Sequence, residues 1–195
     1  MNKMVVGSRV PRKYFITSGQ GESNYSNSPG SFHLALNDAG IGGTNLVGYS
    51  SVLPADLGKV DLPGYIRHGS VLEGIFAIAH GRVGETVTAG IAYGGLHGDE
   101  GLVGSIAAEY GGNLDPGDAR EFLVSSLREM HGGCYPDLRM GSWETITSSF
   151  RPKKPYGSAV VAIGFTEFEV PIIGDCDEEV LAKGLGALDL SSGKR

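Results

Sequence analysis

Cysteine is scarce in this chain, which has only Cys134 and Cys176 among its 195 residues. The two lie far apart and form no metal-ligand pattern, so we expect free thiols in a reducing compartment. A disulfide between them stays open, because a sequence does not supply the geometry that the bond requires. The five histidines are not spaced as a metal-binding pair either, and we expect no metal site.

Long apolar runs and basic clusters are also missing. No stretch approaches the roughly 20 apolar residues of a membrane-spanning helix, and residues 1–7 lack the apolar segment of a signal peptide. The formal net charge is -6 at pH 7 and no run of Lys and Arg occurs, which argues against binding to nucleic acid. We therefore expect a soluble, cytoplasmic protein that binds neither a membrane nor nucleic acid.

The sequence motifs of common nucleotide and hydrolase sites are absent as well. The chain contains no P-loop, no His-Glu-x-x-His and no Gly-x-Ser-x-Gly. Gly19-Gln20-Gly21 resembles the start of a dinucleotide-binding fingerprint, but the third glycine is missing. We interpret this segment as a turn at the end of a strand.

Glycine, by contrast, is abundant, with 32 residues that follow no fixed period. This composition is typical of a tightly turned sheet protein. The apolar patterns predict strands at 13–18, 45–53, 69–80, 86–93, 102–110, 144–150 and 158–168, and helices at 31–39 and 115–131. The two central runs favour a buried hairpin. We expect a layered α/β (α+β) architecture with largely antiparallel or mixed sheets.

The two predicted helices have recognisable ends. Ser31 is expected to cap the first and Gly40 to end it, while Asp115 is expected to cap the second and Gly132 to end it. Their predicted apolar faces are Phe32, Ala35, Leu36 and Ala39 in the first helix, and Phe122, Leu123, Leu127 and Met130 in the second.

Ser50-Ser51 carries no information as an isolated dipeptide, since Ser148-Ser149 and Ser191-Ser192 also occur. Its surroundings do: the chain reads Ala39-Gly40-Ile41-Gly42, Asn45-Leu46, Ser50-Ser51, Val52-Leu53 and Pro54. This order resembles the pyruvoyl-dependent arginine decarboxylase family. Further matches, in order, are Gly21-Glu22-Ser23, His68-Gly69-Ser70-Val71-Leu72-Glu73, Gly84-Glu85-Thr86 and Ala108-Glu109-Tyr110. The resemblance covers roughly residues 13–168.

The resemblance implies a layered αββα sandwich, a single pyruvoyl-decarboxylase domain over residues 1–170. After Pro171 the chain turns acidic and then rich in Gly and Ser, so we expect a partly disordered tail, 171–195. The resemblance also implies a zymogen that cleaves itself. The Ser51 hydroxyl would attack the carbonyl of Ser50, and β-elimination would release a β chain (1–50) from an α chain (51–195). Residue 51 would become a pyruvoyl group with loss of ammonia.

The implied enzyme is a carboxy-lyase that converts arginine to agmatine and CO₂ through a Schiff base with the pyruvoyl group. Glu109 matches the family's proton donor, Asn45 a substrate-contacting asparagine, and Ser50 would offer its new carboxylate or its hydroxyl to the site. Relatives assemble as trimers of αβ protomers with active sites between neighbours, so a homotrimer is expected. Agmatine could feed polyamine biosynthesis or acid resistance, and no residue of the sequence chooses between the two.

His33 departs from the family's pattern, which has an Asp that binds the guanidinium of arginine at this substrate-binding position. A histidine cannot replace a carboxylate as the bidentate partner of a guanidinium. Another acid, such as Glu22, Asp38 or Asp56, could take over. Alternatively, the substrate is a different amino acid, or the chain is an unprocessed, non-catalytic paralogue.

Overall fold

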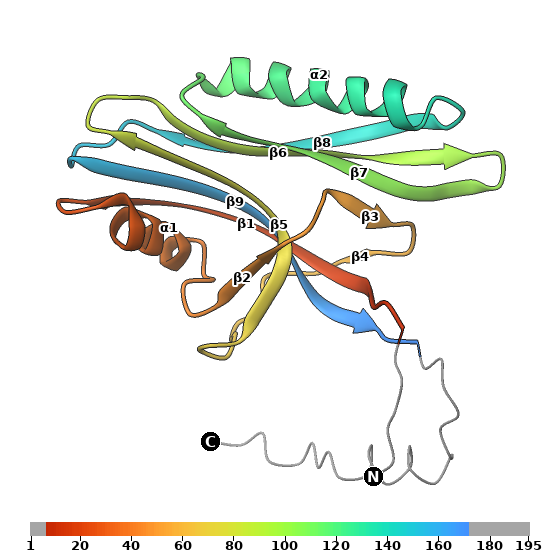
Figure 1. Cartoon of the computed structure of the whole chain (residues 1–195), viewed down its shortest axis with the longest axis horizontal. Helices are drawn as coiled ribbons and strands as arrows, with labels where there is room; N and C mark the ends of the chain where they lie inside the picture. Colours follow the sequence, from red (N-terminus) through yellow and green to blue (C-terminus); the bar gives the residue numbers. More distant parts are fainter. Residues whose placement is uncertain (1–6, 172–195) are drawn as a thin grey trace, which may run out of the picture. The chain divides into compact units, whose positions relative to one another are not determined.

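The computed structural model describes residues 7–171 (Figure 1). Its elements are β1 (Val10–Ser23), η1 (Asn27–Ser31), α1 (Phe32–Asp38), β2 (Asn45–Gly48), β3 (Val52–Pro54), β4 (Gly58–Lys59), β5 (Val71–Arg82), β6 (Val87–Gly98), β7 (Gly101–Gly112), α2 (Pro116–Cys134), β8 (Arg139–Phe150) and β9 (Tyr156–Glu169). Pro11–Glu167 form one compact unit. In the other unit, the Gly7 N–H donates to the carbonyl of Pro171 at 2.7 Å.

The strands form two sheets. The five-stranded sheet has the order β2-β5-β9-β1-β4, and the four-stranded sheet has the order β3-β7-β6-β8. In the five-stranded sheet, β5 pairs with β9 in antiparallel fashion, whereas β2 with β5 and β1 with β4 are parallel. In the four-stranded sheet, the pairs β3 with β7, β7 with β6 and β6 with β8 are all antiparallel. The α1 helix covers the five-stranded sheet and α2 covers the four-stranded sheet (Figure 1). The predicted αββα layers are thus confirmed.

Two glycines explain how α1 lies on its sheet. A Cβ atom at Gly19 would overlap the carbonyl oxygen of Ala35, and one at Gly21 would overlap that of Ser31. The strand β1 therefore continues through both glycines, since their missing side chains let the helix pack directly on the strand backbone. The prediction of a strand-end turn at Gly19-Gln20-Gly21 is wrong.

The ends of α1 agree with the prediction at one side only. Gly40 follows the helix with φ +74°, a left-handed conformation that favours glycine, as expected. Ser31 makes no capping hydrogen bond, because it is already helical and fully buried. Its hydroxyl lies 2.7 Å from that of Ser158 on β9 instead. The predicted apolar face is confirmed, since it packs in the core with Phe15 and Leu72.

The helix α2 extends further than predicted. Asp115 holds the N-cap position in extended backbone, but its side chain makes no capping hydrogen bond. Gly132 does not end the helix, which continues to Cys134. Leu123 and Leu127 are buried against the four-stranded sheet, and Met130 packs against the same cluster, as predicted. Phe122 is 46% exposed, but its ring lies 5.2 Å from that of Tyr110 on β7.

Two predictions about strand pairing are wrong. The single strand expected at 45–53 is divided into β2 and β3, which belong to different sheets. The runs expected to form a hairpin become β5 and β6, which also lie in different sheets. Both runs are buried in a sandwich, and burial patterns do not reveal to which sheet a strand belongs.

The remaining expectations concern the cysteines, membrane-spanning helices and metal sites. Cys134 is an exposed free thiol, while Cys176 and all of the predicted tail beyond Pro171 lie outside the described residues. Among the helices of residues 7–171, none is long and apolar enough to cross a membrane. That same range holds no group of three His, Cys, Asp or Glu side chains able to bind a metal ion.

Candidate active site

Ser50 and Ser51 lie where the chain passes from one sheet to the other. The strand β2 is an edge of the five-stranded sheet, and β3 is an edge of the four-stranded sheet. Residues 49–51 make the connection between them, which Figure 1 shows crossing beside β5. The peptide bond between the two serines is therefore held by different sheets on its two sides.

On the upstream side, Tyr49 is fixed to the five-stranded sheet. Its backbone N–H donates to the carbonyl of Gly74 at 2.8 Å. Its hydroxyl donates to the carboxylate of Glu73, a buried residue with 7% exposure. Its ring lies 5.0 Å from that of Phe165 on β9. Three kinds of contact thus hold the residue that precedes Ser50.

On the downstream side, Ser51 is fixed to the four-stranded sheet. Its carbonyl accepts a hydrogen bond from the Ala107 N–H at 2.9 Å, and Val52 then pairs with Ile106. The Ser51 hydroxyl donates to the carboxylate of Glu109 on β7. The structure thereby brings together the two residues predicted to be catalytic.

The backbone at Ser51 is strained. In the described part of the chain it is the one non-glycine residue with positive φ, at 61°. A left-handed serine is less stable than an extended one, on the order of 1–2 kcal/mol. Such strain persists only where surrounding contacts impose it, and it is often found at reactive positions.

Asn45 opens β2, and the structure ties its side chain to the backbone. Its amide Nδ2 donates to the carbonyl of Gly69 at 3.1 Å, and its backbone N–H donates to that of Ser70 at 2.8 Å. The residue is exposed, as is Ser50. Within residues 7–171, neither side chain has a hydrogen bond to Ser51 or Glu109.

His33 is exposed on α1. This helix and β3 lie well apart in Figure 1, so the chain does not bring His33 to its own Ser50-Ser51 bond. Of the three acids considered in its place, Asp56 is paired with Arg12. Glu22 and Asp38 instead accept hydrogen bonds from backbone N–H groups.

Glu22 and Asp38 line one hollow of about 470 Å³, together with Gln20, Gly21, Leu34, Phe150 and Lys154. The carboxylate of Asp38 accepts from the Gln20 N–H at 2.8 Å, and that of Glu22 accepts from the Lys154 N–H at 3.3 Å. Both contacts hold the carboxylates without neutralising them, because the donors are uncharged.

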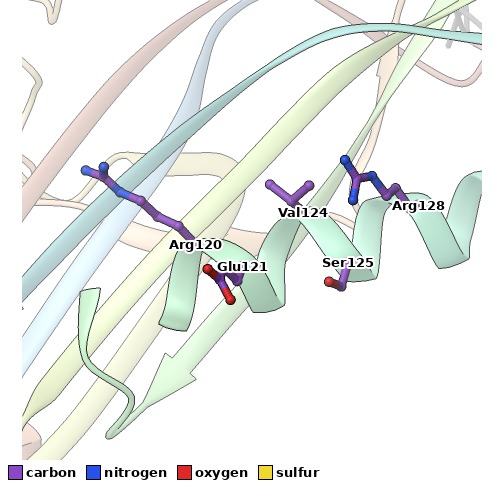
Figure 2. A pocket seen from close by; sticks show the side chains of 5 residues that line it. All are labelled: Arg120, Glu121, Val124, Ser125 and Arg128. Carbon is purple, nitrogen blue, oxygen red and sulfur yellow. The ribbon is translucent and has the colours of Figure 1, made fainter. Parts of the chain in front are cut away.

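Two further hollows lie away from these acids. One of about 200 Å³ borders β3 and is lined by Tyr14, Leu53, Pro54, Ala55, Leu57, Tyr93, Leu102 and Ser105. Another, of about 350 Å³, lies on the outer face of α2 (Figure 2) and is lined by Arg120, Glu121, Val124, Ser125 and Arg128. Figure 2 shows Val124 between the two arginines along the helix.

A tyrosine–carboxylate pair lies beside the smaller hollow. The Tyr93 hydroxyl donates to Glu144 at 2.6 Å, and Lys59 approaches the same carboxylate at 3.4 Å. Burial, followed by the hydrogen bond to Glu144, raises the pKa of Tyr93. The hydrogen bond from Tyr93 holds the pKa of Glu144 below its usual value.

The contributions of Tyr49, Glu73 and Ala107 were not predicted from the sequence. Ala107 acts through its backbone, so no side-chain pattern identifies it. Glu73 did give a signal, because it is the one acid within the apolar run 71–79. A glutamate that is buried in a strand is rarely left without a partner.

The chain is similar to known proteins over most of its length. The family model of pyruvoyl-dependent arginine decarboxylase (PvlArgDC) matches residues 13–170. The pyruvoyl-dependent arginine decarboxylase of Methanopyrus kandleri is 34% identical over 157 residues, covering 78% of this chain and 95% of that protein. Pyruvoyl-dependent arginine decarboxylase AaxB of Chlamydia muridarum is 32% identical over 194 residues, covering 85% of this chain and 96% of that protein.

The family's name specifies a covalently bound pyruvoyl group. The residues present fit such a group at position 51. A serine with a strained backbone occupies the position, its carbonyl is held by a backbone N–H, and its hydroxyl is held by a carboxylate. From the matched residues, the extent of the match and the arrangement of the site, we conclude that the chain belongs to the pyruvoyl-dependent arginine decarboxylase family.

Proposed function

We propose that this chain cleaves itself between Ser50 and Ser51 and then decarboxylates arginine to agmatine and CO₂. The observation that carries the proposal is the hydrogen bond from the Ser51 hydroxyl to Glu109, at the point where the chain changes sheets. The names of the relatives favour arginine over another amino acid. Agmatine would then be available for polyamine biosynthesis.

Self-cleavage would begin with attack of the Ser51 Oγ on the carbonyl carbon of Ser50. A C–O bond forms, the C–N bond between the residues breaks, and the nitrogen of residue 51 takes up a proton. Removal of the Cα proton of residue 51 then breaks its Cβ–O bond and releases Ser50 as a carboxylate. Water then hydrolyses residue 51, and the nitrogen leaves as ammonia. The products are a β chain (1–50) and an α chain (51–195).

The chain's own groups prepare the first step. The Ala107 N–H and the Tyr49 contacts hold both sides of the scissile bond, while Glu109 accepts from the attacking hydroxyl and orients it. An amide oxygen at position 109 would orient the hydroxyl in the same way. Holding reacting atoms together in this manner lowers the entropy that the transition state must lose.

In decarboxylation, the pyruvoyl group supplies an electron sink for the electrons that CO₂ leaves behind. Glu109 would donate a proton to the substrate carbon that has lost CO₂, since it already lies against the side chain of residue 51. Asn45 would bind the substrate carboxylate through an amide that both donates and accepts. Ser50 would contribute its new terminal carboxylate or its hydroxyl.

The guanidinium of arginine needs a carboxylate, which His33 does not offer. Asp56 is paired with Arg12, whereas Glu22 and Asp38 share a hollow and have only uncharged donors in the described contacts. We assign the guanidinium to these two acids. Because α1 and β3 lie apart in one protomer, the hollow would serve the Ser51 of a neighbouring protomer in a homotrimer of αβ protomers.

The experiment is an assay of purified protein with separate amino acids: arginine, ornithine, lysine, histidine and aspartate. We expect agmatine from arginine and no amine from the others. The control is Ser51→Ala, which lacks the attacking hydroxyl and should give no product at all. An amine from a different amino acid would overturn the substrate, and a chain that stays uncleaved and inactive would favour a non-catalytic paralogue.

A further inference from the structure

We infer that Tyr49 and Glu73 are positioning residues for self-cleavage, which hold Ser50 in place so that the Ser51 hydroxyl can reach its carbonyl carbon. The inference rests on the proposed function, since it concerns the cleavage step of that same site. Neither residue is expected to exchange a proton with the reacting atoms. Their effect would pass through the backbone at residues 49 and 50.

The geometry upstream of the bond is rigid for identifiable reasons. Glu73 and Gly74 are buried in β5, and their strand lies so close to β9 that a Cβ atom at Gly74 would overlap the carbonyl oxygen of Ile163. The Gly74 carbonyl accepts from the Tyr49 N–H at 2.8 Å. The ring of Tyr49 packs on Phe165, which is 3% exposed. Tyr49 is thus held by elements that cannot shift independently.

The hydroxyl of Tyr49 fixes the direction of this packing. A ring on Phe165 could slide or tilt at little cost, because apolar contacts are not directional. The hydrogen bond to the Glu73 carboxylate removes that freedom. A bond to a buried carboxylate is among the stronger protein hydrogen bonds. The Tyr49–Glu73 pair therefore fixes the backbone position of residue 49, and with it the position of the Ser50 backbone that follows.

Ser50 itself is exposed, and it lies between two anchored neighbours. On its other side, the Ala107 N–H and Glu109 hold the carbonyl and the hydroxyl of Ser51. The acyl shift requires the Ser51 Oγ to approach the carbonyl carbon of Ser50 within a five-membered ring. If the Tyr49 anchor is loosened, the attacked carbonyl moves while the attacking hydroxyl stays.

Two possible roles of Glu73 can be distinguished by substitution: orienting Tyr49 as a hydrogen-bond acceptor, and acting by its charge or as a base. If Glu73 acts as an acceptor that orients Tyr49, then Glu73→Gln preserves the contact, because an amide oxygen also accepts. If Glu73 acts by its charge, or as a base, Glu73→Gln would slow self-cleavage. Tyr49→Phe removes the hydroxyl and keeps the ring on Phe165. These single substitutions change the hydrogen bond without changing the shape of the site.

The experiment measures the rate at which full-length protein gives the 1–50 chain, by intact mass, together with the melting temperature of each uncleaved chain. We expect Tyr49→Phe to cleave at least about tenfold more slowly, which corresponds to about 1.4 kcal/mol of activation free energy. Glu73→Gln should stay within about threefold of the unchanged chain, which is under 1 kcal/mol. The matched control is Thr17→Val, which removes a half-buried hydroxyl that donates to Ala39 at 2.6 Å and lies outside the site.

A double variant, Tyr49→Phe with Glu73→Leu, separates positioning from stability, because it removes the buried carboxylate together with the phenol hydroxyl that bonds to it. We expect it to be as stable as the unchanged chain and still slow to cleave. Normal cleavage by Tyr49→Phe or by the double variant would overturn the inference, as would a loss in Glu73→Gln equal to that in Tyr49→Phe. Each of these results leaves the proposed function intact. An unchanged chain that does not cleave would instead count against the proposed function itself.

Discussion

The hydroxyl of Ser51 donates a hydrogen bond to the carboxylate of Glu109, which lies 58 residues further along the chain. Antiparallel pairing of β3 with β7 creates this contact, since Val52 opposite Ile106 sets Ser51 beside Ala107. Glu109 follows two residues later on β7, where successive odd residues share one face. The contact is therefore a consequence of strand register.

Replacing Glu109 with glutamine is expected to separate the two reactions. The amide can still accept from the Ser51 hydroxyl, so self-cleavage should continue. It cannot donate an acidic proton, so turnover of arginine should fall by roughly 100-fold or more. The kcat of fully cleaved protein provides the measurement. The control is Glu121→Gln on the outer face of α2, and near-normal turnover by Glu109→Gln would contradict the assignment.

Adding a methyl group at Gly21 is expected to destabilise the protein. Its Cβ atom would overlap the backbone of Ser31, which precedes α1, and of Ala35 in α1, and forced displacement of packed elements typically costs about 1–3 kcal/mol. Urea unfolding of Gly21→Ala gives the free-energy change. Gly132→Ala is the matched control, because a Cβ atom there meets nothing within 4 Å and alanine favours a helix by up to about 1 kcal/mol. Equal stability of the two variants would disprove the close approach.

Neutralising the hollow acids is expected to weaken arginine binding. The double variant Glu22→Gln with Asp38→Asn keeps the acceptors for their backbone partners but loses both charges. Since a hydrogen bond to a charged group contributes about 1.5–3 kcal/mol, the KM for arginine should rise about tenfold or more while self-cleavage is unchanged. Asp56→Asn, which disrupts the pair with Arg12, should leave KM unaltered. A normal KM in the double variant rejects these acids as the guanidinium partner.

Stability should depend on pH through His80. Desolvation of its ring, which lies 5.7 Å from that of Phe32, lowers the pKa of His80 below 6.5 in the folded state. The unfolded chain then binds the proton more readily, so this contribution is complete above pH 6.5 and is lost as pH falls through the folded pKa. Melting temperatures at pH 5 and pH 8 should diverge more for the unchanged chain than for His80→Asn. If the difference in melting temperature between pH 5 and pH 8 is the same for both proteins, His80 does not contribute to the pH dependence of stability.

The sequence predicted the helices and most strands because their signals are local. Apolar spacing located Leu123 and Leu127, and Gly40 marked the end of α1 through its left-handed backbone. The assignment of strands to sheets was not predictable, since β5 and β6 are both buried runs joined by a short turn. Gly19 and Gly21 were misread for a related reason: their meaning depends on a helix that packs across the strand.

In the candidate site too, some residues could be predicted from the sequence and others could not. Ser51 and Glu109 were predicted because the motifs around them match those of the family in the same order. The structure places their side chains in contact. Tyr49 has no motif of its own, and its role depends on a carboxylate from β5 and a ring from β9. Such a contact arises from pairing between distant segments, which no local pattern records.

The central claim is that Ser51 is converted to a pyruvoyl group by cleavage of its own peptide bond. Intact mass of the purified chain after incubation tests this most directly. We predict two species, residues 1–50 with a free carboxylate and residues 51–195 lighter by one ammonia than the simple hydrolysis product, with Ser51→Ala remaining whole. A single full-length species from the unchanged chain, or a 51–195 chain that keeps its amino terminus, would contradict the account.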